Sequence, residues 1–287
     1  MLASCVCHVA KFKGKPDAGN PPVRFDEGEG GTPPYSTGSI VFSDSGQTTT
    51  FVKTTRGRAM TKKKIEGIEA CVFDAYGTLF DVHSAVGRHT DRLGDKASAV
   101  SDTWRTKQLQ YTWLRSLMGR HEDFWQVTGQ ALDHAFEMHG VSDDALKKNL
   151  MAAYLSLDCY PEVPEVLASL KAAGFTCAIL SNGTPHMLEA AVESARIEAH
   201  LDRLLSVEAV GIYKPDPRVY QMGPDALGLS ADRVVFMSSN AWDAAGAAAF
   251  GFHVAWVNRF GQAPERLPGS IDSEIPTLAD LPALIGR

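Results

Sequence analysis

Carboxylate, hydroxyl, amide and ammonium side chains occur at four places in this sequence, each at or shortly after the end of a short apolar run. They are Asp74 and Thr78; Ser181 and Asn182; Lys214; and Ser238, Asn240 and Asp243. A carboxylate can attack an electrophile to form a covalent intermediate, or exchange a proton as a general acid or base. Asp is also common in turns after strands, so Asp74 indicates chemistry only if the other groups lie beside it.

The elements around these residues predict an α/β fold that brings them together. Residues 70–73 form a buried strand that runs into a turn at Tyr76 to Thr78. After Pro161, predicted strands alternate with predicted helices; the strands are 175–180, 204–207, 234–237 and 254–257. This alternation is typical of right-handed parallel βαβ units, whose carboxyl ends share the edge where ligands bind. We therefore expect a Rossmann-like parallel sheet with the polar groups in one crevice.

Residues 82–158 differ from this pattern and are predicted to be all-helical. Apolar residues recur there at helical spacing, with a break near Gly119: Trp104, Leu109, Trp113, Leu114 and Leu117, then Phe124, Val127, Leu132 and Phe136. Such an insertion is placed to cover the crevice, where it would exclude water and strengthen electrostatic interactions. The predicted domains are a core of residues 65–81 and 159–287 and a helical cap of residues 82–158.

The first 64 residues are rich in Gly, Pro, Ser and Thr and show neither structural period, so we predict a disordered or non-native extension. Met60, before three lysines, is a plausible native start. The five cysteines are odd in number and scattered, which disfavours a disulfide framework. Cys5 and Cys7 form a pair without the second cluster that a four-ligand zinc site needs.

Composition limits the classes of partner. The net charge of −6 and the lack of a basic stripe among the 287 residues give no case for nucleic acid. No run approaches the roughly 20 apolar residues that cross a bilayer, so no membrane contact is expected and a cytoplasmic location is predicted. The nine histidines are dispersed without zinc-hydrolase spacing. A small-molecule ligand is the favoured expectation.

Four segments resemble the motifs of the haloacid dehalogenase superfamily. They are Phe73-Asp74-Ala75-Tyr76-Gly77-Thr78-Leu79, Ser181-Asn182-Gly183, Lys214-Pro215 and Ser238-Ser239-Asn240-Ala241-Trp242-Asp243. Within the superfamily the chain is similar to the 2-haloacid dehalogenases, through Tyr76, the Trp104-Arg105 pair and the Leu109 to Tyr111 run. The resemblance covers about residues 65–268 and leaves the N-terminal segment unexplained.

Metal-dependent phosphatases are the commonest members of this superfamily, and two positions weigh against that activity here. The phosphatases carry a second Asp two residues after the nucleophile to protonate an alkoxide, whereas this chain has Tyr76. A halide needs no proton to depart. Phosphatases also hold Mg²⁺ with adjacent carboxylates in the last motif, where this chain has Ser238, Ser239 and Asn240. We therefore expect no metal and no other cofactor.

The resemblance implies a role for each polar group. Asp74 would attack the halogen-bearing carbon, Lys214 would keep Asp74 ionised, and Asp243, with Asn240, would activate the hydrolytic water. The remaining catalytic residues would be Thr78, Arg105 as the halide acceptor, Ser181, Asn182, Tyr220 holding the nucleophile or the lysine, and Ser238 bonded to a carboxylate. Substrate would contact Tyr76, Arg105, Leu109, Phe124, Ser181, Asn182, Lys214 and Trp242.

Structural alternatives stay open for several of these residues. Arg105 could be a surface residue of an amphipathic helix, and the aromatic and leucine side chains could simply pack the core. The resemblance implies hydrolysis of L-2-haloacids with inversion, by a homodimer. A phosphatase of the same superfamily and a non-catalytic binding protein on the same fold are the alternative functions.

Overall fold

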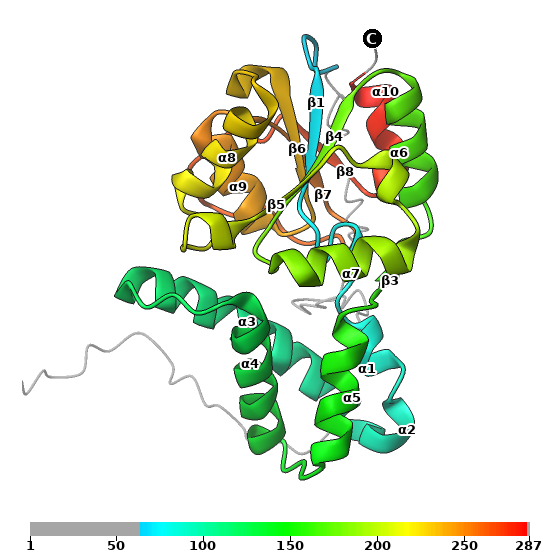
Figure 1. Ribbon diagram of the computed structural model, residues 1–287, viewed down its shortest axis with the longest axis vertical. Helices are drawn as coiled ribbons and strands as arrows, with labels where there is room; N and C mark the ends of the chain where they lie inside the picture. Colours follow the sequence, from blue (N-terminus) through cyan, green and yellow to red (C-terminus); the bar gives the residue numbers. More distant parts are fainter. Residues whose placement is uncertain (1–63, 286–287) are drawn as a thin grey trace, which may run out of the picture. The chain divides into compact units, whose positions relative to one another are not determined.

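The computed structural model describes residues 64–285 (Figure 1). The predictions for residues 1–63, including the Cys5 and Cys7 pair and the start at Met60, lie outside this range. Within the described part of the chain, none of the helices combines the length and the apolar character needed to span a bilayer.

The core is a sheet of six strands in the order β5-β4-β1-β6-β7-β8, with every neighbouring pair parallel. The strands are β1 (Ala70–Phe73), β4 (Thr176–Ser181), β5 (Arg203–Ser206), β6 (Val234–Ser238), β7 (His253–Val257) and β8 (Ser273–Ile275). All residues of β1 and β6 are buried, as expected when helices cover both faces of a parallel sheet. The predicted α/β class with a parallel sheet is confirmed.

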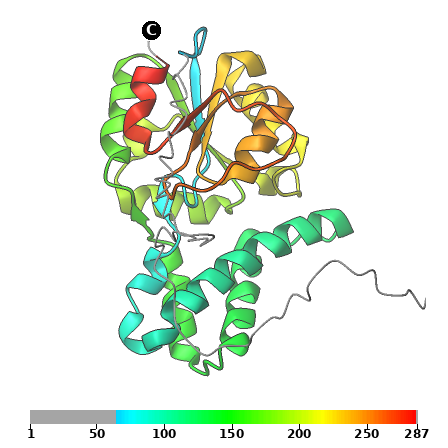
Figure 2. The ribbon, with the colours of Figure 1, turned by 180° about the vertical axis from the view of Figure 1, so that it is seen from behind.

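Helices cover the two faces of this sheet. Figures 1 and 2 show α8 and α9 on one side and α6 and α10 on the other. The helices are α6 (Val163–Ala172), α7 (Pro185–Ala195), α8 (Pro217–Leu227), α9 (Ala241–Phe250) and α10 (Leu281–Leu284). The hydroxyl of Thr184 and the carboxylate of Asp216 accept hydrogen bonds from the first-turn N–H groups of α7 and α8. Gly228 and Gly251 end α8 and α9 with positive φ.

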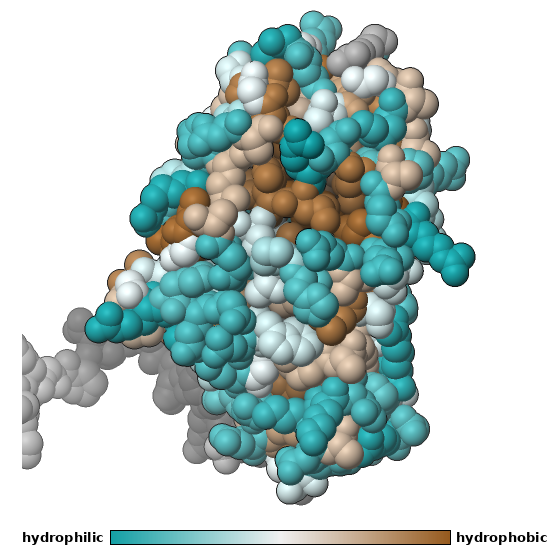
Figure 3. Space-filling view, viewed as in Figure 1, coloured by the Kyte–Doolittle hydropathy of each residue, from teal (hydrophilic) through white to brown (hydrophobic). Residues whose placement is uncertain are grey.

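Short 3-10 turns connect several of these elements in the core. They are η2 (Glu198–His200), η3 (Val207–Ala209), η4 (Ala231–Arg233) and η5 (Leu278–Asp280). Figure 3 shows apolar side chains gathered on the core beside the edge strand β5, where Leu204 and Leu205 are half-buried. This strand pairs with β4 on one side only.

A helical segment is inserted between β1 and β4. It leaves through β2 (Phe80–Asp81) and returns through β3 (Asp158–Cys159), which pair antiparallel. Its elements are α1 (Ser84–Gly87), α2 (Thr90–Leu93), η1 (Gly94–Lys96), α3 (Ala97–Met118), α4 (Phe124–Met138) and α5 (Asp144–Tyr154). The predicted domain boundaries fall at this two-stranded neck and remain a prediction.

The break predicted near Gly119 is present. Gly119 adopts the left-handed conformation and ends α3, and the Asp123 carboxylate then caps α4 by accepting from the N–H of Gln126. Trp104 and Phe124 are buried, but Leu114 and Leu117 are 51% and 84% exposed. The large apolar side chains of α3 are therefore buried in the first half of the helix, and Leu114 and Leu117 near its end are exposed.

Candidate active site

Three neighbouring strands bring the polar motifs to one edge of the sheet. Phe73, the last residue of β1, lies opposite Ile179 of β4 and Met237 of β6. Asp74 follows directly, and its N–H donates to the Met237 carbonyl over 2.9 Å. The residues after β1, β4 and β6 consequently share the carboxyl edge of the sheet, as the sequence predicts.

Asp74 is 6% exposed, and three donors hold its carboxylate. Lys214 Nζ donates to Oδ1 over 3.0 Å; Thr78 Oγ1 and Asn240 Nδ2 donate to Oδ2 over 3.0 and 2.9 Å. Thr78 Oγ1 also accepts from the N–H of Ser239 over 2.8 Å, which leaves its own proton directed at Asp74. Both carboxylate oxygens are therefore fixed in direction.

Lys214 is a cation buried between two carboxylates. Its side chain is 1% exposed, and Nζ lies 3.0 Å from Asp74 Oδ1 and 2.8 Å from Asp243 Oδ2. Burial by itself lowers the pKa of this ammonium, but the charges of Asp243 and Asp74 outweigh it and leave the pKa above its ordinary value. Nζ also lies 4.9 Å from the centroid of the Phe236 ring. Lys214 is therefore held in its charged form.

Asp243 lies in the first turn of α9 and is fully buried. Its Oδ1 accepts from the Tyr220 hydroxyl over 2.8 Å, so Tyr220 bonds to this carboxylate and to neither the nucleophile nor the lysine. Burial raises the pKa of Asp243 above its ordinary value, although Lys214 and Tyr220 both act to lower it. Asp243 is thus a carboxylate of raised pKa in contact with the same cation as Asp74.

The serines at this edge shape the loops. Ser181 Oγ accepts from the N–H of Gly183 over 3.1 Å, and Ser238 Oγ accepts from the N–H of Asn240, also over 3.1 Å. We expected Ser238 to bond to a carboxylate, but among the described residues its hydroxyl has no such contact. Instead, the hydroxyl closes a short backbone turn with Asn240. Asn182 Oδ1 accepts from the backbone N–H of Lys214 over 3.1 Å and so fixes the lysine loop.

Arg105 reaches this edge from α3 of the helical insertion. Its Nη2 donates to the Tyr76 carbonyl over 3.2 Å and to Asn240 Oδ1 over 3.1 Å. The Asn240 amide therefore links Arg105 to Asp74, because its oxygen accepts from Arg105 and its nitrogen donates to Asp74. Arg105 is half-buried and bonded to the core, so the surface alternative considered for it is wrong.

The four apolar and aromatic side chains that were predicted to bind substrate separate into three places. Tyr76 and Phe124 are buried with ring centroids 5.7 Å apart, whereas Trp242 packs edge-on against Trp113 at 5.2 Å. Leu109 is half-buried on α3. Tyr76 and Phe124 form one wall beside Asp74, and the structure gives no contact that joins Trp242 or Leu109 to that wall.

Tyr154 and Gln108 lie beside the site and were not anticipated from the sequence, whereas Gly183 was noted there only as part of a motif. Tyr154 stacks on Tyr76 at 5.5 Å, and Gln108 accepts from Arg105. Gly183 lies under Tyr76 so closely that a Cβ would be 2.7 Å from Tyr76 Cε2. The Tyr76 hydroxyl is buried and has no hydrogen-bond partner among the described residues. Burial raises its pKa well above the ordinary value, so this phenol stays protonated.

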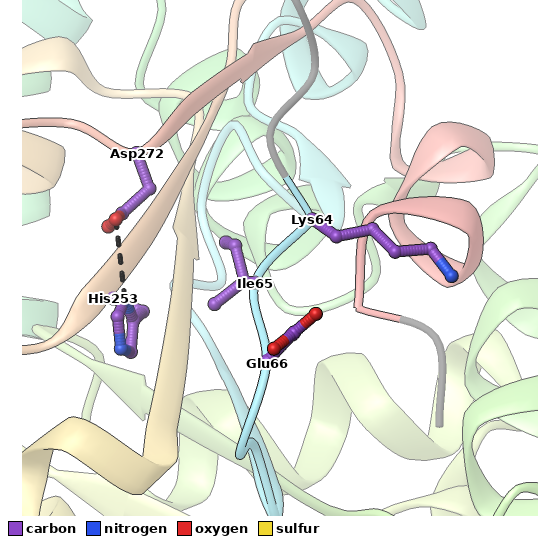
Figure 4. Close-up of a pocket in the computed structure, with 5 residues that line it drawn as sticks. All are labelled: Lys64, Ile65, Glu66, His253 and Asp272. Atoms are coloured by element: carbon purple, nitrogen blue, oxygen red, sulfur yellow. Dashed lines mark hydrogen bonds and ion pairs between the residues drawn. The ribbon is translucent and has the colours of Figure 1, made fainter.

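A cavity of about 430 Å³ lies elsewhere on the core (Figure 4). It is lined by residues 64–66 together with His253, the first residue of β7, and Asp272. This is the amino edge of the sheet, opposite to Asp74, and its His253 and Asp272 side chains bond to each other. Among residues 64–285, no group of three or more His, Cys, Asp or Glu side chains is arranged to hold a metal ion.

The buried charges generate a stability prediction. Lys214→Met leaves Asp74 and Asp243 buried without their cation, which costs about 3–5 kcal/mol of unfolding free energy at neutral pH. Without Lys214 the pKa of Asp243 rises further above its unfolded value, and such a group stabilises the fold at low pH and ceases to do so as the pH rises. The loss should therefore shrink on acidification. Urea denaturation at two pH values measures it.

Lys171→Met is the matched control for this prediction. Lys171 pairs with Asp202 at 2.7 Å, but both side chains are about one-third exposed, so its loss should cost at most about 1 kcal/mol. Equal effects of the two substitutions would contradict a charge-compensating role for Lys214.

Comparisons with known proteins agree with this arrangement. A model of the haloacid dehalogenase-like hydrolases matches residues 68–251. (S)-2-haloacid dehalogenase 4A of Burkholderia cepacia is 46% identical over 224 residues, which cover 78% of this chain and 97% of that protein. (S)-2-haloacid dehalogenase 1 of Pseudomonas sp. (strain CBS-3) is also 46% identical, over 78% of this chain and 99% of its own length.

Solved structures show the same similarity. The L-2-haloacid dehalogenase from Xanthobacter autotrophicus, with chloropropionic acid covalently bound, superimposes with a TM-score of 0.71 at 37% identity, over 76% of this chain and 98% of that one. A crystal structure of a dehalogenase gives a TM-score of 0.75 at 46% identity, over 77% and 98%. With its parallel sheet, inserted helices and charged edge, the chain belongs to the haloacid dehalogenase-like hydrolase family.

Proposed function

We propose that this chain hydrolyses short L-2-haloalkanoic acids to D-2-hydroxyalkanoic acids and halide, through an ester formed on Asp74. The observation that carries the proposal is the carboxylate of Asp74, buried and held by Lys214, Thr78 and Asn240 with no second carboxylate two residues later. Similarity to (S)-2-haloacid dehalogenases supports the substrate class and its enantiomer.

In the first half-reaction, an oxygen of the Asp74 carboxylate attacks C2 of the substrate from the side opposite the halogen. A carbon–oxygen bond forms as the carbon–halogen bond breaks, and the carbon inverts. The halide leaves with the bonding electrons and needs no proton. Lys214 balances the charge of Asp74 beforehand, and its 3.0 Å contact with Oδ1 keeps the carboxylate ionised and oriented.

The departing halide is received by the Arg105 guanidinium, with Asn182 as a second contact. A guanidinium is always charged and weakly hydrated, so it suits an anion that has lost its water shell. The carboxylate of the substrate binds Ser181 and the Asn182 backbone, at the turn that precedes α7, together with Lys214 from the loop that precedes α8. Tyr76 and Phe124 contact the alkyl chain, and their 5.7 Å ring contact supports this role.

In the second half-reaction, water attacks the carbonyl carbon of the Asp74 ester. Asp243 takes the proton of that water, and Asn240 helps to position it. The bond between the carbonyl carbon of Asp74 and the product oxygen then breaks, and Asp243 returns its proton to that departing oxygen. The hydroxy acid therefore keeps an oxygen that came from Asp74, and the proton left on the regenerated Asp74 carboxyl is released to solvent. The raised pKa of Asp243 supports this role, because a base of higher pKa takes a proton more readily.

The direct test is halide release from both enantiomers of 2-chloropropionate, with and without a chelator. We expect release from the L enantiomer only, unaffected by the chelator. Asp74→Asn should lower the rate by more than about 10³-fold, because the nucleophile is lost. Asp232→Asn, at an exposed aspartate, is the matched control and should keep the wild-type rate.

Several outcomes contradict the proposal. Substantial turnover by Asp74→Asn would remove the nucleophile from the mechanism. Hydrolysis of p-nitrophenyl phosphate that requires Mg²⁺ would indicate the phosphatase alternative. Binding of a haloacid that stabilises the fold without turnover would indicate a binding protein.

The contact between Tyr220 and Asp243 predicts a pH effect. A general base must be ionised, so kcat is retained above the pKa of Asp243 and falls as the pH falls through it. The Tyr220 hydroxyl lowers that pKa, so Tyr220→Phe raises it and the fall in kcat begins at a higher pH. Tyr111→Phe, at a half-buried tyrosine of α3, serves as the control. If the pH at which kcat falls in Tyr220→Phe were unchanged or lower than in the wild type, Asp243 would be excluded as the base.

We further propose that the protein acts as a homodimer in the cytoplasm. Three large apolar side chains are exposed near the end of α3, namely Leu114, Leu117 and Met118 at 51%, 84% and 63%. Exposed apolar groups that lie close together are typical of contact surfaces between chains.

A further inference from the structure

Gln108 of α3 is a buried amide one helical turn after Arg105. It is 1% exposed, and its Oε1 accepts from Arg105 Nη1 over 2.8 Å. Glutamine is usually a surface residue, and burying an amide costs free energy unless its polar atoms are bonded. The contacts of Gln108 therefore need an explanation beyond packing.

A hydrogen-bond chain fixes which end of the Gln108 amide faces Arg105. Thr128 Oγ1 donates its single proton to the Phe124 carbonyl over 2.6 Å, so towards Gln108 it can only accept. Gln108 Nε2 donates to that oxygen over 2.7 Å. The nitrogen thus faces Thr128, and the oxygen is left facing Arg105. The Tyr154 hydroxyl lies 3.0 Å from Nε2 and 3.1 Å from Oε1, so it can bond to either end of the amide, and Thr128 is the residue that fixes the orientation.

The Arg105 guanidinium is consequently held at both ends. Gln108 binds Nη1 within the helical insertion, and the Tyr76 carbonyl and Asn240 Oδ1 bind Nη2 from the core. On the side of the helical insertion, the cavity lined by Arg105, Gln108 and Tyr154 measures about 10 Å³, enough for about one water, so little space is left there.

The groups of the helical insertion that hold the Arg105 guanidinium carry no charge. Gln108 and Thr128 do not ionise, and burial raises the pKa of the Tyr154 hydroxyl, so it stays protonated. A carboxylate at position 108 would bond to the guanidinium more strongly, but it would also cancel the charge that attracts an anion. A neutral acceptor orients Arg105 and leaves its charge uncompensated.

We propose that Gln108 is a positioning residue, which holds the Arg105 guanidinium in the direction needed to receive halide while leaving its positive charge for that halide. Gln108 itself does not touch the substrate. The inference rests on the proposed function, since it assigns Gln108 to the halide-accepting step.

The test compares Q108E and Q108M with Q110E and Q110M. Gln110 lies two residues further along α3, is half-buried and bonds only to Lys107 among the described residues, so it controls for helix propensity and added charge. For each variant we would measure kcat and KM with L-2-chloropropionate, the inhibition constants of chloride and bromide, and the thermal unfolding midpoint.

We expect kcat to fall about 10- to 100-fold in Q108E and Q108M, the range typical of losing a partner that orients a catalytic group. KM should change less, because the substrate carboxylate binds elsewhere. The inhibition constants of chloride and bromide should rise, and more in Q108E than in Q108M, because only the glutamate cancels the charge. The Gln110 variants should resemble wild type.

The failures are distinguishable. Wild-type turnover with normal halide inhibition in Q108E and Q108M would overturn this proposal alone. A fall in kcat that follows a lowered unfolding midpoint, with unchanged halide constants, would show a structural role and also overturn it. No halide release by the wild-type chain from either enantiomer would overturn the proposed function and this inference with it.

Discussion

The ammonium group of Lys214, buried between Asp74 and Asp243, is the constraint on which the rest of the site depends. Two buried carboxylates repel each other and lose their hydration, and one cation in contact with both reduces both penalties. The same cation links the two halves of the proposed reaction, since one carboxylate is the nucleophile and the other the base. Thr78, Asn240 and Tyr220 then direct the individual oxygens.

The fold satisfies this constraint through its parallel sheet. Because β1, β4 and β6 are neighbours with a common direction, the segments that follow them meet at one edge although they lie far apart in sequence. The helical insertion completes the edge from a different direction, through Arg105 and Phe124. Asn240 is the junction of the two parts, since its amide bonds to Asp74 at one end and to Arg105 at the other. Core and insertion therefore form the site together.

The parallel sheet, the helical insertion and the charged residues at the strand ends could be predicted from the sequence, because strand ends and helical spacing are local patterns. The resemblance also implied the pairing of Lys214 with Asp74, which the structure contains, but other partners of these residues were not predicted. Nothing in the sequence indicates that Gln108 turns towards Arg105, or that Tyr220 bonds to Asp243, because both facts depend on how helices pack. Ser238 was expected at a carboxylate and instead closes a backbone turn. Leu117 fits the apolar period of α3 yet is 84% exposed, because its helix extends beyond the core that would cover it.

Covalent catalysis by Asp74 is tested most directly by the origin of its carboxylate oxygens. The chain would be run through many turnovers of L-2-chloropropionate in water enriched in oxygen-18, digested, and the peptide that contains Asp74 weighed by mass spectrometry. The ester mechanism predicts that oxygen-18 enters the Asp74 side chain, because water attacks the carbonyl carbon of that residue. Label found in the hydroxy acid from the first turnover onward, with none in Asp74, would mean that water attacks the substrate directly and would contradict the mechanism.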